Sequence, residues 1–288
     1  MQNVEKLDDV LEKGTSKRIM TYNVWNVWSL RSTGPENKRS RIEGCATVIH
    51  ENNPDFICLQ EYDHCYRYHT DGLHFSLISE KYAEASLKDV DPSYVWNPIF
   101  YNKEKYSLIE NGMVDFKEEG ATTEEYKYAA CIDERSHFRS LVWAVLEDND
   151  DRSKYIVGSL HYSVNVDQHE AQAKLVIDKI KELCGRYDAV SLVCGDYNCL
   201  IPKNWNTDMA GCGVMAREGF KDTYLLADDK NDVASANKLG EVATRSYADY
   251  GIDHVMTLSD IKVEAYCTLN TERIRQFSDH NPVVVQFS

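Results

Sequence analysis

The sequence predicts a mixed α/β sandwich with helices on the outside. Segments rich in β-branched and aromatic residues alternate with stretches whose apolar residues recur at helical spacing. Hairpin-like pairs of strand segments occur alongside strands that a helix separates. This combination is typical of a layered protein with mixed sheets.

The length allows more than one domain organisation. The chain has 288 residues, of which 43% are hydrophobic, so it can bury one large core or two smaller ones. No stretch has the composition of an interdomain linker, and no internal repeat is found. We therefore expect one domain over residues 18–288, preceded by an N-terminal extension over residues 1–17.

The first part of the chain predicts a strand, a helix and a second strand. The letters RIMTYNVW at residues 18–25 favour a strand, and a polar turn with Pro35 follows. The apolar face of the helix is formed by Ile42, Cys45, Ala46 and Ile49. Pro54 ends the helix, and PDFICLQE at residues 54–61 predicts a buried strand that runs into a carboxylate.

The rest of the chain continues the alternation. A helix is expected over residues 167–184, where an apolar stripe stops at Gly185. The polar stretches 116–126 and 227–245 have no periodic apolar face and are expected to be surface loops. Further strands are expected at residues 94–101, 106–110, 139–147, 154–162, 189–194, 251–258, 261–269 and 281–287.

The charge limits the kinds of partner. A formal net charge of −15 argues against a protein that holds nucleic acid with a broad basic surface. It does not exclude nucleic acid as a substrate, because a metal ion in a carboxylate-lined cleft supplies positive charge locally.

Location and cysteine usage point to an intracellular setting. No apolar stretch is long enough to cross a bilayer, and the first residues lack the apolar core of a signal peptide. We expect a cytoplasmic protein, or a secreted one if a signal was removed. The nine cysteines show neither CxxC pairs nor zinc-site spacing. They are expected to be buried small apolar residues without a site of their own.

Several predicted strands end in polar residues of the kind that bind metals and phosphates. Carboxylate oxygens with one amide suit a hard cation such as Mg²⁺, which takes few protein ligands and keeps several waters. Histidines beside them could stabilise charge on a phosphoryl oxygen or transfer protons. In chain order these residues are Asn23, Glu61, His161, Asp196, Asn198, Asp253, His254, Asp279 and His280.

Taken singly, each of these residues also has a structural explanation. An Asn or Asp after a strand is most often a turn former or a helix cap. A Glu at a strand end is usually solvated, and a His beside a strand is more often structural than catalytic. Asp279 and His280, followed by Asn281 and Pro282, could form an Asx-type turn before the last strand. The joint pattern favours the functional explanation.

Seven motifs in order resemble those of the endonuclease/exonuclease/phosphatase superfamily. The resemblance covers the chain from about residue 18 to the C-terminus. It implies a deoxyribonuclease I-like fold, which is a four-layer α-β-β-α sandwich of two mixed β-sheets. The motifs are YNVW (22–25), PDFICLQE (54–61), WNPIFYNKEKYSLIENG (96–112), IVGSLHYS (156–163), GDYN (195–198), GIDHVM (251–256) and SDHNPVVV (278–285).

The resemblance implies a Mg²⁺ site, with Mn²⁺ as an alternative ion. Glu61 resembles the principal metal ligand, and Asn23 and Asp279 are expected close enough to share the metal or a bound water. Arg139 is a weaker candidate for a contact to a substrate phosphate, and it could equally be a plain surface arginine.

The resemblance also implies catalytic roles. Asp196 resembles the residue that orients or deprotonates the attacking water, and Asn198 the amide that holds a phosphate oxygen and fixes that aspartate. His280 would contact the scissile phosphate, with Asp253 as its orienting carboxylate. His161 would donate to a non-bridging oxygen in the transition state. In this set the metal and the histidines would neutralise charge at phosphorus, and an aspartate would activate water for in-line attack.

The implied function is a Mg²⁺-dependent phosphoesterase that hydrolyses a phosphodiester by metal-assisted in-line attack of water. His161 stands where exonuclease III-type repair enzymes carry a tyrosine, which disfavours abasic-site repair. The stretch 246–256 lacks the cysteine-and-arginine motif of inositol 5-phosphatases, which disfavours that branch. Gly251 and His254 replace an arginine and a tyrosine that are common in relatives, so the finer substrate contacts differ.

Three alternatives remain on the same fold. They are a phosphomonoesterase, a sphingomyelinase of phospholipase C type, and a catalytically inactive binding protein, although an inactive protein would be expected to have lost at least one site residue. The expected partner is a phosphoester substrate (nucleic acid, nucleotide or phospholipid headgroup), with no stable membrane insertion and no partner protein implied. Trp25, Trp28 and Trp205 could stack on a base or sugar, or pack structurally.

Overall fold

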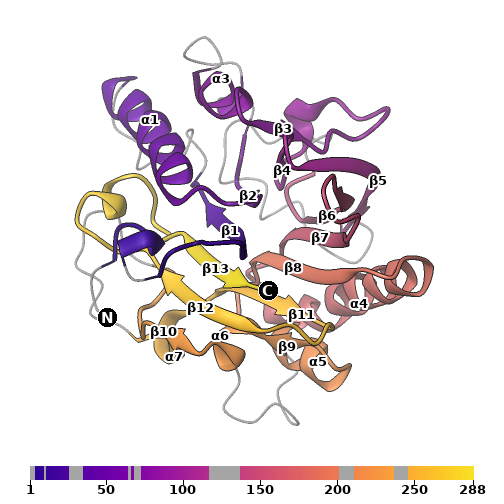
Figure 1. The fold of residues 1–288 in the computed structure, drawn as a ribbon. Helices are drawn as coiled ribbons and strands as arrows, with labels where there is room; N and C mark the ends of the chain where they lie inside the picture. The colour runs from indigo at the N-terminus through magenta and orange to yellow at the C-terminus, as the bar shows by residue number, and fades with distance from the viewer. Residues whose placement is uncertain are drawn as a thin grey trace.

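Within the described residues, two mixed β-sheets pack face to face and carry helices on their outer sides (Figure 1). The computed structural model describes residues 4–9, 11–25, 35–63, 66–67, 73–116, 137–200, 211–236 and 246–288. The arrangement confirms the predicted four-layer sandwich. None of the described helices is long and apolar enough to cross a membrane.

The first sheet has the strand order β10-β12-β13-β1-β2-β4-β3. Its β1/β2 and β10/β12 pairs are parallel, and the other neighbours are antiparallel. The strands are β1 (Lys17–Asn23), β2 (Phe56–Gln60), β3 (Tyr82–Glu84), β4 (Ile99–Asn102), β10 (Asp229–Lys230), β12 (Val263–Thr268) and β13 (Val283–Phe287).

The second sheet has the order β5-β6-β7-β8-β11-β9, and only its central pair β7/β8 is parallel among the described strands. The strands are β5 (Tyr106–Asp115), β6 (Ser140–Asp148), β7 (Lys154–His161), β8 (Val190–Asp196), β9 (Lys221–Asp222) and β11 (Asp253–Thr257). The helix α4, which crosses from β7 to β8, makes that parallel pairing possible.

The longer helices lie outside the sheets, and short helical turns connect the strands. The α-helices are α1 (Pro35–Asn52), α3 (Leu73–Ser79), α4 (His169–Arg186), α5 (Gly211–Arg217), α6 (Thr223–Leu226) and α7 (Tyr247–Tyr250). The 3₁₀ turns are η1 (Leu7–Asp9), η3 (Pro92–Tyr94), η6 (Val166–Gln168) and η7 (Ile274–Gln276).

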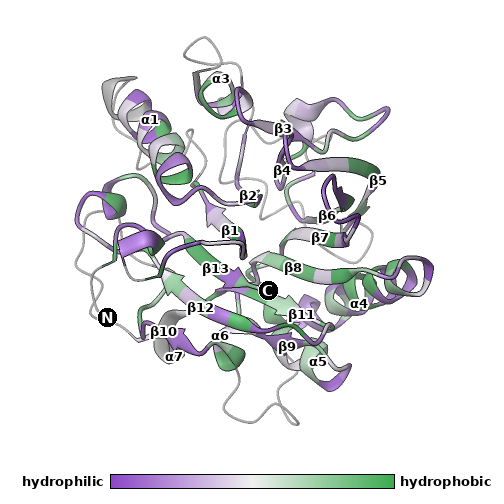
Figure 2. Cartoon of the chain, viewed as in Figure 1, coloured by the Kyte–Doolittle hydropathy of each residue, from purple (hydrophilic) through white to green (hydrophobic). Residues whose placement is uncertain are grey.

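Among the described residues, apolar side chains form three clusters, one between each pair of adjacent layers. Alternation along β1 places Met20 under α1 and Ile19 between the sheets. On the far side, Val193 of β8 packs with Val176 and Ile180 of α4. Figure 2 shows the corresponding hydrophobic residues along β8 and β13 and the mixed faces of α4. Strands buried on both faces therefore explain the continuous apolar runs in the sequence.

The bounds of several elements differ from those predicted, and the strand expected at 94–101 begins only at Ile99, after the turn η3. Pro35 begins α1 instead of lying in the preceding turn, because proline is compatible with the first helical position. β5 extends to Asp115, past the turn-like letters ENG, with an irregular register after Leu108. α4 continues through Gly185 to Arg186, since one glycine in a last turn costs little.

The predicted surface loop at 227–245 is correct only in part, because residues 228–230 and 232 are exposed but others are not. Residues 231 and 233–235 are buried. This segment packs against neighbouring strands through hydrogen bonds, so it needs no periodic apolar face. The side chain of Asn231, for example, accepts from the backbone N–H of Thr268 at 2.9 Å and donates to its carbonyl at 2.8 Å. Of the predicted loop 116–126, residues 117–126 lie outside the described residues.

The N-terminal segment contacts the domain. Val4 and Leu7 belong to the cluster beneath α1, and the backbone N–H of Leu7 donates to the side chain of Asn52 at 2.9 Å. Arg18, at the start of β1, is fully buried and pairs with Asp8 at 2.6 Å. Residues 4–9 therefore share the core of the domain that follows.

Gly195→Ala is expected to destabilise the protein by about 3 kcal/mol or more. Gly195 lies in β8 with φ +151°, and an added Cβ would lie 2.0 Å from the backbone oxygen of Leu160 in β7. Urea unfolding measures the effect. The control is Gly185→Ala in α4, where a Cβ meets nothing within 4 Å and a small stabilisation is expected. Equal midpoints for the two variants would contradict the steric argument.

Candidate functional site

The registers of the two sheets bring the polar strand ends together. Asn23 ends β1 beside Gln60 of β2, and Glu61 is the next residue. In the other sheet, Asp196 pairs with His161 on one side and with Asp253 on the other. The first residue of β11 reaches this place because β11 runs antiparallel to β8.

Asn23 links the ends of the two sheets. Its Nδ2 donates to Asp196 Oδ2 at 3.0 Å and lies 3.3 Å from Glu61 Oε1. The carbonyl of Asn23 accepts from Ser278 Oγ at 2.7 Å, which ties β1 to the turn that carries Asp279 and His280. Residues far apart in sequence thereby form one buried cluster.

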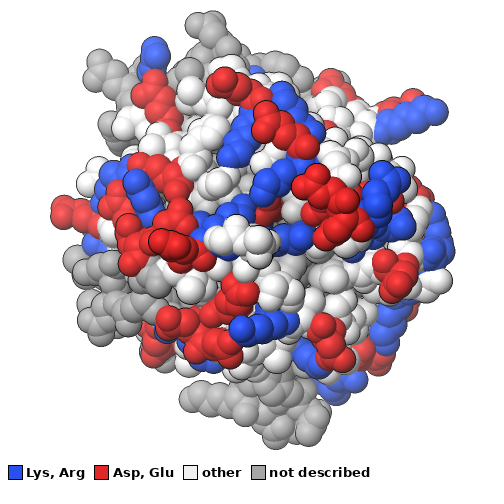
Figure 3. All heavy atoms as spheres, viewed as in Figure 1, with Lys and Arg blue, Asp and Glu red and all other residues white. Residues whose placement is uncertain are grey.

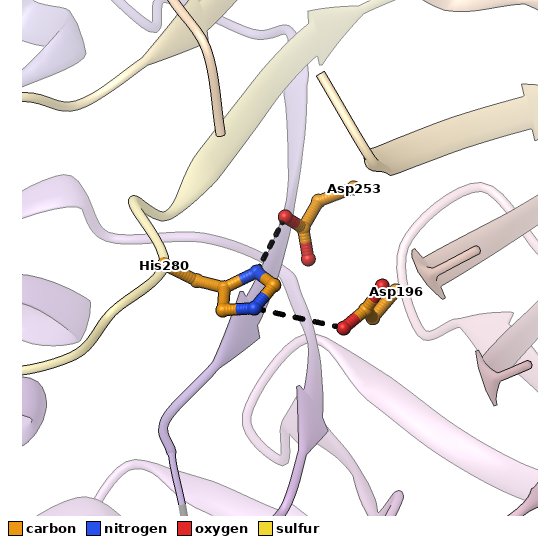
Figure 4. Close-up of side chains that lie close together, drawn as sticks. All are labelled: Asp196, Asp253 and His280. Carbon is orange, nitrogen blue, oxygen red and sulfur yellow. Dashed lines mark hydrogen bonds and ion pairs between the residues drawn. The ribbon is translucent and has the colours of Figure 1, made fainter. Parts of the chain in front are cut away.

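Asp196 lies between two histidines. Its Oδ2 is 3.4 Å from His161 Nε2 and 3.7 Å from His280 Nε2, and His280 Nδ1 lies 2.8 Å from Asp253 Oδ2 (Figure 4). The separations to Asp196 exceed a good N–H···O bond, so both Nε2 atoms retain hydrogen-bonding capacity. The Nδ1 of His161 is buried without a hydrogen-bond partner, which favours the tautomer that carries its proton on Nε2.

The surroundings separate the protonation states of these groups. Burial raises the pKa of Asp196, but the imidazoles of His161 and His280 and the backbone N–H of Asn198 together outweigh burial and lower that pKa below its usual range. Burial lowers the pKa of His280, but Asp253 and then Asp196 outweigh it and raise that pKa well above 6.5. Burial, together with Arg139, lowers the pKa of His161. At neutral pH Asp196 is therefore ionised, His280 protonated and His161 neutral.

Two groups of residues here could hold a metal ion. Asp196, Asp253 and His280 offer ligand atoms within 4.8 Å of one another, the compact cluster of this kind in the described part of the chain. Beside it lie Glu61 and Asp279. Burial raises the pKa of Asp279 to about 6 and the charge of Glu61 adds to this, although His280 and Arg41 act in the opposite direction.

The carboxylates next to Asn23 fit a divalent cation. Asp279 Oδ1 is buried and lacks a hydrogen-bond partner, and Glu61 raises its pKa through like-charge repulsion. A bound cation would relieve both conditions. Asn23 presents its amide N–H groups to Glu61 and Asp196, while its Oδ1 accepts from the backbone N–H of Trp25 at 3.0 Å. As a ligand, Asn23 would use the remaining lone pair of that oxygen.

Asn198 and Arg139 support the ends of β7 and β8. Asn198 has φ +48°, and its backbone N–H donates to Asp196 Oδ1 at 2.9 Å. Its Nδ2 and the Nη1 of Arg139 both donate to the carbonyl of Tyr162, at 2.9 and 2.6 Å. Arg139 is only 4% exposed, so the interpretation as a plain surface arginine is wrong. Tyr197 is fully buried and packs beneath α4, as strand alternation indicates.

Trp25 packs structurally in this structure. It is buried, and the guanidinium of Arg41 lies 4.4 Å from its ring centroid. Trp28 and Trp205 lie outside the described residues.

A serine that the sequence did not single out holds the His280–Asp253 pair. Ser235 Oγ accepts the backbone N–H groups of Ile252 and Asp253 at 3.0 and 2.9 Å. The carbonyl of Ser235 accepts from the N–H of Asn281 at 2.6 Å, and Ala236 forms a β-bridge with His280. No periodicity or charge pattern marks this segment, because its role depends on backbone groups.

His254 stands beside Asp253 but faces away from the cluster. Its Nδ1 lies 2.6 Å from Tyr247 Oη and 2.9 Å from Asp222 Oδ2, and its Nε2 lies 2.9 Å from the carbonyl of Cys199. Burial lowers the pKa of His254, but Asp222 outweighs burial and raises that pKa to about 9. The protonated ring can donate from Nδ1 to Asp222 and from Nε2 to the carbonyl of Cys199, so His254 is structural in this arrangement.

The His254–Asp222 pair is expected to make stability pH-dependent. A raised folded pKa means that its contribution, at most about 3 kcal/mol, is fully present below the unfolded pKa of about 6.5. It is lost as pH rises towards about 9. Urea unfolding of wild type and His254→Gln, between about pH 6 and about pH 10, should show a difference that shrinks with rising pH. A constant difference would contradict the assignment.

Comparison with known proteins agrees with this geometry. Residues 20–280 match the model of the Endonuclease/Exonuclease/phosphatase family. No curated protein sequence matches the chain. Among solved structures, the chain is similar to a mannosyl-6-phosphatase of Bacteroides thetaiotaomicron VPI-5482, with 17% identity, 95% of this chain and 100% of the other covered, and a TM-score of 0.70.

Two further solved structures share the fold. A D. rerio TDP2 complexed with single-strand DNA product is 16% identical, over 95% of this chain and 99% of the other, with a TM-score of 0.63. The human Nocturnin catalytic domain with bound sulfate anion is 16% identical, over 95% and 94%, with a TM-score of 0.64. At these identities the likeness concerns the fold, whereas the family match spans nearly the whole chain. The chain belongs to the endonuclease/exonuclease/phosphatase family.

Proposed function

We propose that the protein is a Mg²⁺-dependent phosphoesterase that hydrolyses a phosphodiester by in-line attack of water. The observation that carries the proposal is the position of Asp196 Oδ2 between the Nε2 atoms of His161 and His280, at 3.4 and 3.7 Å. A buried base close to buried proton donors supplies the proton acceptance and the charge stabilisation that hydrolysis at phosphorus needs.

The roles follow from the protonation states. Asp196 accepts a proton from the attacking water, and Asn198 fixes that carboxylate through its backbone N–H. His280 donates from Nε2 to a phosphoryl oxygen, while Asp253 orients the ring through Nδ1. His161 donates from its Nε2 to a second oxygen. The buried Arg139 would add positive charge near the phosphoryl oxygen that His161 contacts. We assign it a direct contact to the substrate.

Glu61, Asp279 and the oxygen of Asn23 would hold the metal. Bound there, Mg²⁺ would neutralise charge that develops on the phosphoryl group, and Mn²⁺ has the same ligand preference. The buried and unpartnered Asp279 Oδ1 supports this placement.

The surface charge bears on which phosphodiester the protein could accept. On the face in Figure 3, Lys and Arg are interspersed with Asp and Glu and form no continuous basic area among the described residues. Together with the net charge of −15, this favours a short or local phosphodiester over long duplex DNA.

The structural relatives are a reason to test phosphomonoester hydrolysis as a second candidate function. One structural relative is a mannosyl-6-phosphatase, and another was solved with single-strand DNA product. The assay panel should contain bis-p-nitrophenyl phosphate, p-nitrophenyl phosphate, sphingomyelin, RNA, and single-stranded and duplex DNA. We expect faster turnover of diesters than of the monoester.

Metal removal gives the direct check. Chelation with EDTA should lower the rate by roughly a thousandfold, because a metal contributes several kcal/mol to charge stabilisation. Mg²⁺ should also raise the thermal midpoint of wild type but not that of Glu61→Gln. Lys230→Gln, an exposed change in β10, is the control and should keep the Mg²⁺ response. The proposal would be overturned if no substrate of the panel were hydrolysed and Mg²⁺ did not raise the thermal midpoint of wild type.

A further inference from the structure

Two free cysteines lie close together directly behind the catalytic strand ends. Cys199 follows Asn198, and Cys212 is the second residue of α5. Their Sγ atoms are 3.1 Å apart. Cys212 is fully buried and Cys199 is 6% exposed.

The contacts of Cys199 stabilise a thiolate. Its Sγ accepts a hydrogen bond from the Cys212 backbone N–H at 3.3 Å and lies 3.1 Å from the Cys212 Sγ. His169 also contacts Cys199, and its Nε2 is held by the carbonyl of Ser163 at 2.6 Å. Burial raises the pKa of Cys199, but the bonds from Cys212 and His169 outweigh burial and lower that pKa to about 5.

Other buried cysteines differ in this respect. Burial raises the pKa of Cys45 to about 11 and that of Cys267 to about 12. Cys194, inside β8, neighbours Cys58 in the apolar layer between the sheets, and burial raises its pKa well above 9.0. A thiolate with a thiol within reach is the arrangement that favours disulfide formation, and Cys199 with Cys212 has it.

We propose that Cys199 and Cys212 are a redox-modification site that hydrogen peroxide converts into a disulfide, which a thiol reductant reverses. The Cys199 thiolate attacks one peroxide oxygen, the O–O bond breaks, and water leaves after protonation, which gives a sulfenic acid. The Cys212 sulfur then attacks the Cys199 sulfur, the S–S bond forms, and hydroxide leaves with the Cys212 proton as water. Two electrons pass from the two thiols to the peroxide.

Formation of the disulfide would affect the active site by displacing Asn198. Bond formation brings the sulfurs about 1 Å closer than their present 3.1 Å. The neighbouring Asn198 holds Asp196 through its N–H and the end of β7 through Tyr162. Displacement of a positioning group on this scale lowers kcat, and we expect about a tenfold loss that a thiol reductant restores. This activity readout rests on the proposed function, whereas the chemical readout does not.

Peptide mapping of the intact protein tests the chemistry. Reduced protein is treated with hydrogen peroxide, blocked with N-ethylmaleimide and digested with trypsin. We expect a disulfide between the peptides 187–203 and 204–217, which dithiothreitol removes. The first peptide also contains Cys194, so Cys194→Ala serves as the matched control and should keep the link.

The variants assign the partners. Cys199→Ala and Cys212→Ala should each abolish the link and make activity insensitive to peroxide. Because mapping of the wild type needs no variant, poor folding of either one does not affect the test. Complete labelling of both cysteines after peroxide, or a link through Cys194, would overturn the proposal. A linked protein with unchanged kcat would overturn its coupling to Asn198.

Discussion

Asp196→Asn is expected to lower kcat by about 10³–10⁴-fold, because the site loses its general base. The carboxylate lies within 3.7 Å of both histidine Nε2 atoms, and its pKa is held below the usual range. An amide of nearly the same shape cannot accept the proton of water. Steady-state hydrolysis of the best substrate in the panel measures the loss.

The same substitution should lower the unfolding midpoint at neutral pH without preventing folding. Asp253 still compensates the charge of His280, so no buried cation is left alone. A carboxyl with a lowered folded pKa contributes stability above its unfolded pKa of about 3.9, which is lost as pH falls through the folded pKa. Wild type and variant should therefore converge in strongly acidic solution.

Asp222→Asn is the matched control. Asp222 is another fully buried carboxylate paired with a histidine, His254, but it lies outside the cluster around Asp196. Its variant should keep kcat within a few-fold of wild type even if stability falls. Equal loss of kcat in Asp222→Asn and Asp196→Asn would indicate that structural damage, not loss of a base, explains the effect.

The sequence predicted the layers and strand ends well for a physical reason. Strands buried on both faces must be continuously apolar, so β8 and β13 stand out, and a polar residue that ends such a run is conspicuous. Asp196 and His161 could be placed together once both strands were taken to end at one edge. The resemblance to a family supplied the roles of these residues, which periodicity alone does not contain.

Other features could not be predicted because they depend on tertiary contacts. Ser235 acts through backbone N–H groups of a distant strand, and its segment looks like a polar loop in sequence. The burial of Arg139 depends on the carbonyl of Tyr162 and the ring of Phe138, neither of which leaves a pattern. The approach of Cys199 to Cys212 depends on where α5 docks.

His280→Ala should lower kcat by about 10³-fold, and Asp253→Asn by about 10²-fold, because Asp253 acts through the ring that it orients. Asp253 also raises the pKa of His280, so activity that needs the protonated ring should fall at lower pH in Asp253→Asn than in wild type. The pH dependence of kcat/KM checks this direction. Ser235→Ala, which loosens Asp253 without removing a charge, should lower kcat without moving the alkaline limb.

The double variant distinguishes two functions for the cluster. If Asp253 only orients His280, Asp253→Asn should cost almost nothing further in a His280→Ala background, because the group that it serves is gone. If Asp196, Asp253 and His280 together bind a metal, each loss should weaken the thermal response to Mg²⁺ and the losses in kcat should accumulate. Non-additive kcat with an unchanged Mg²⁺ response would assign His280 to the phosphate and leave the metal to Glu61 and Asp279.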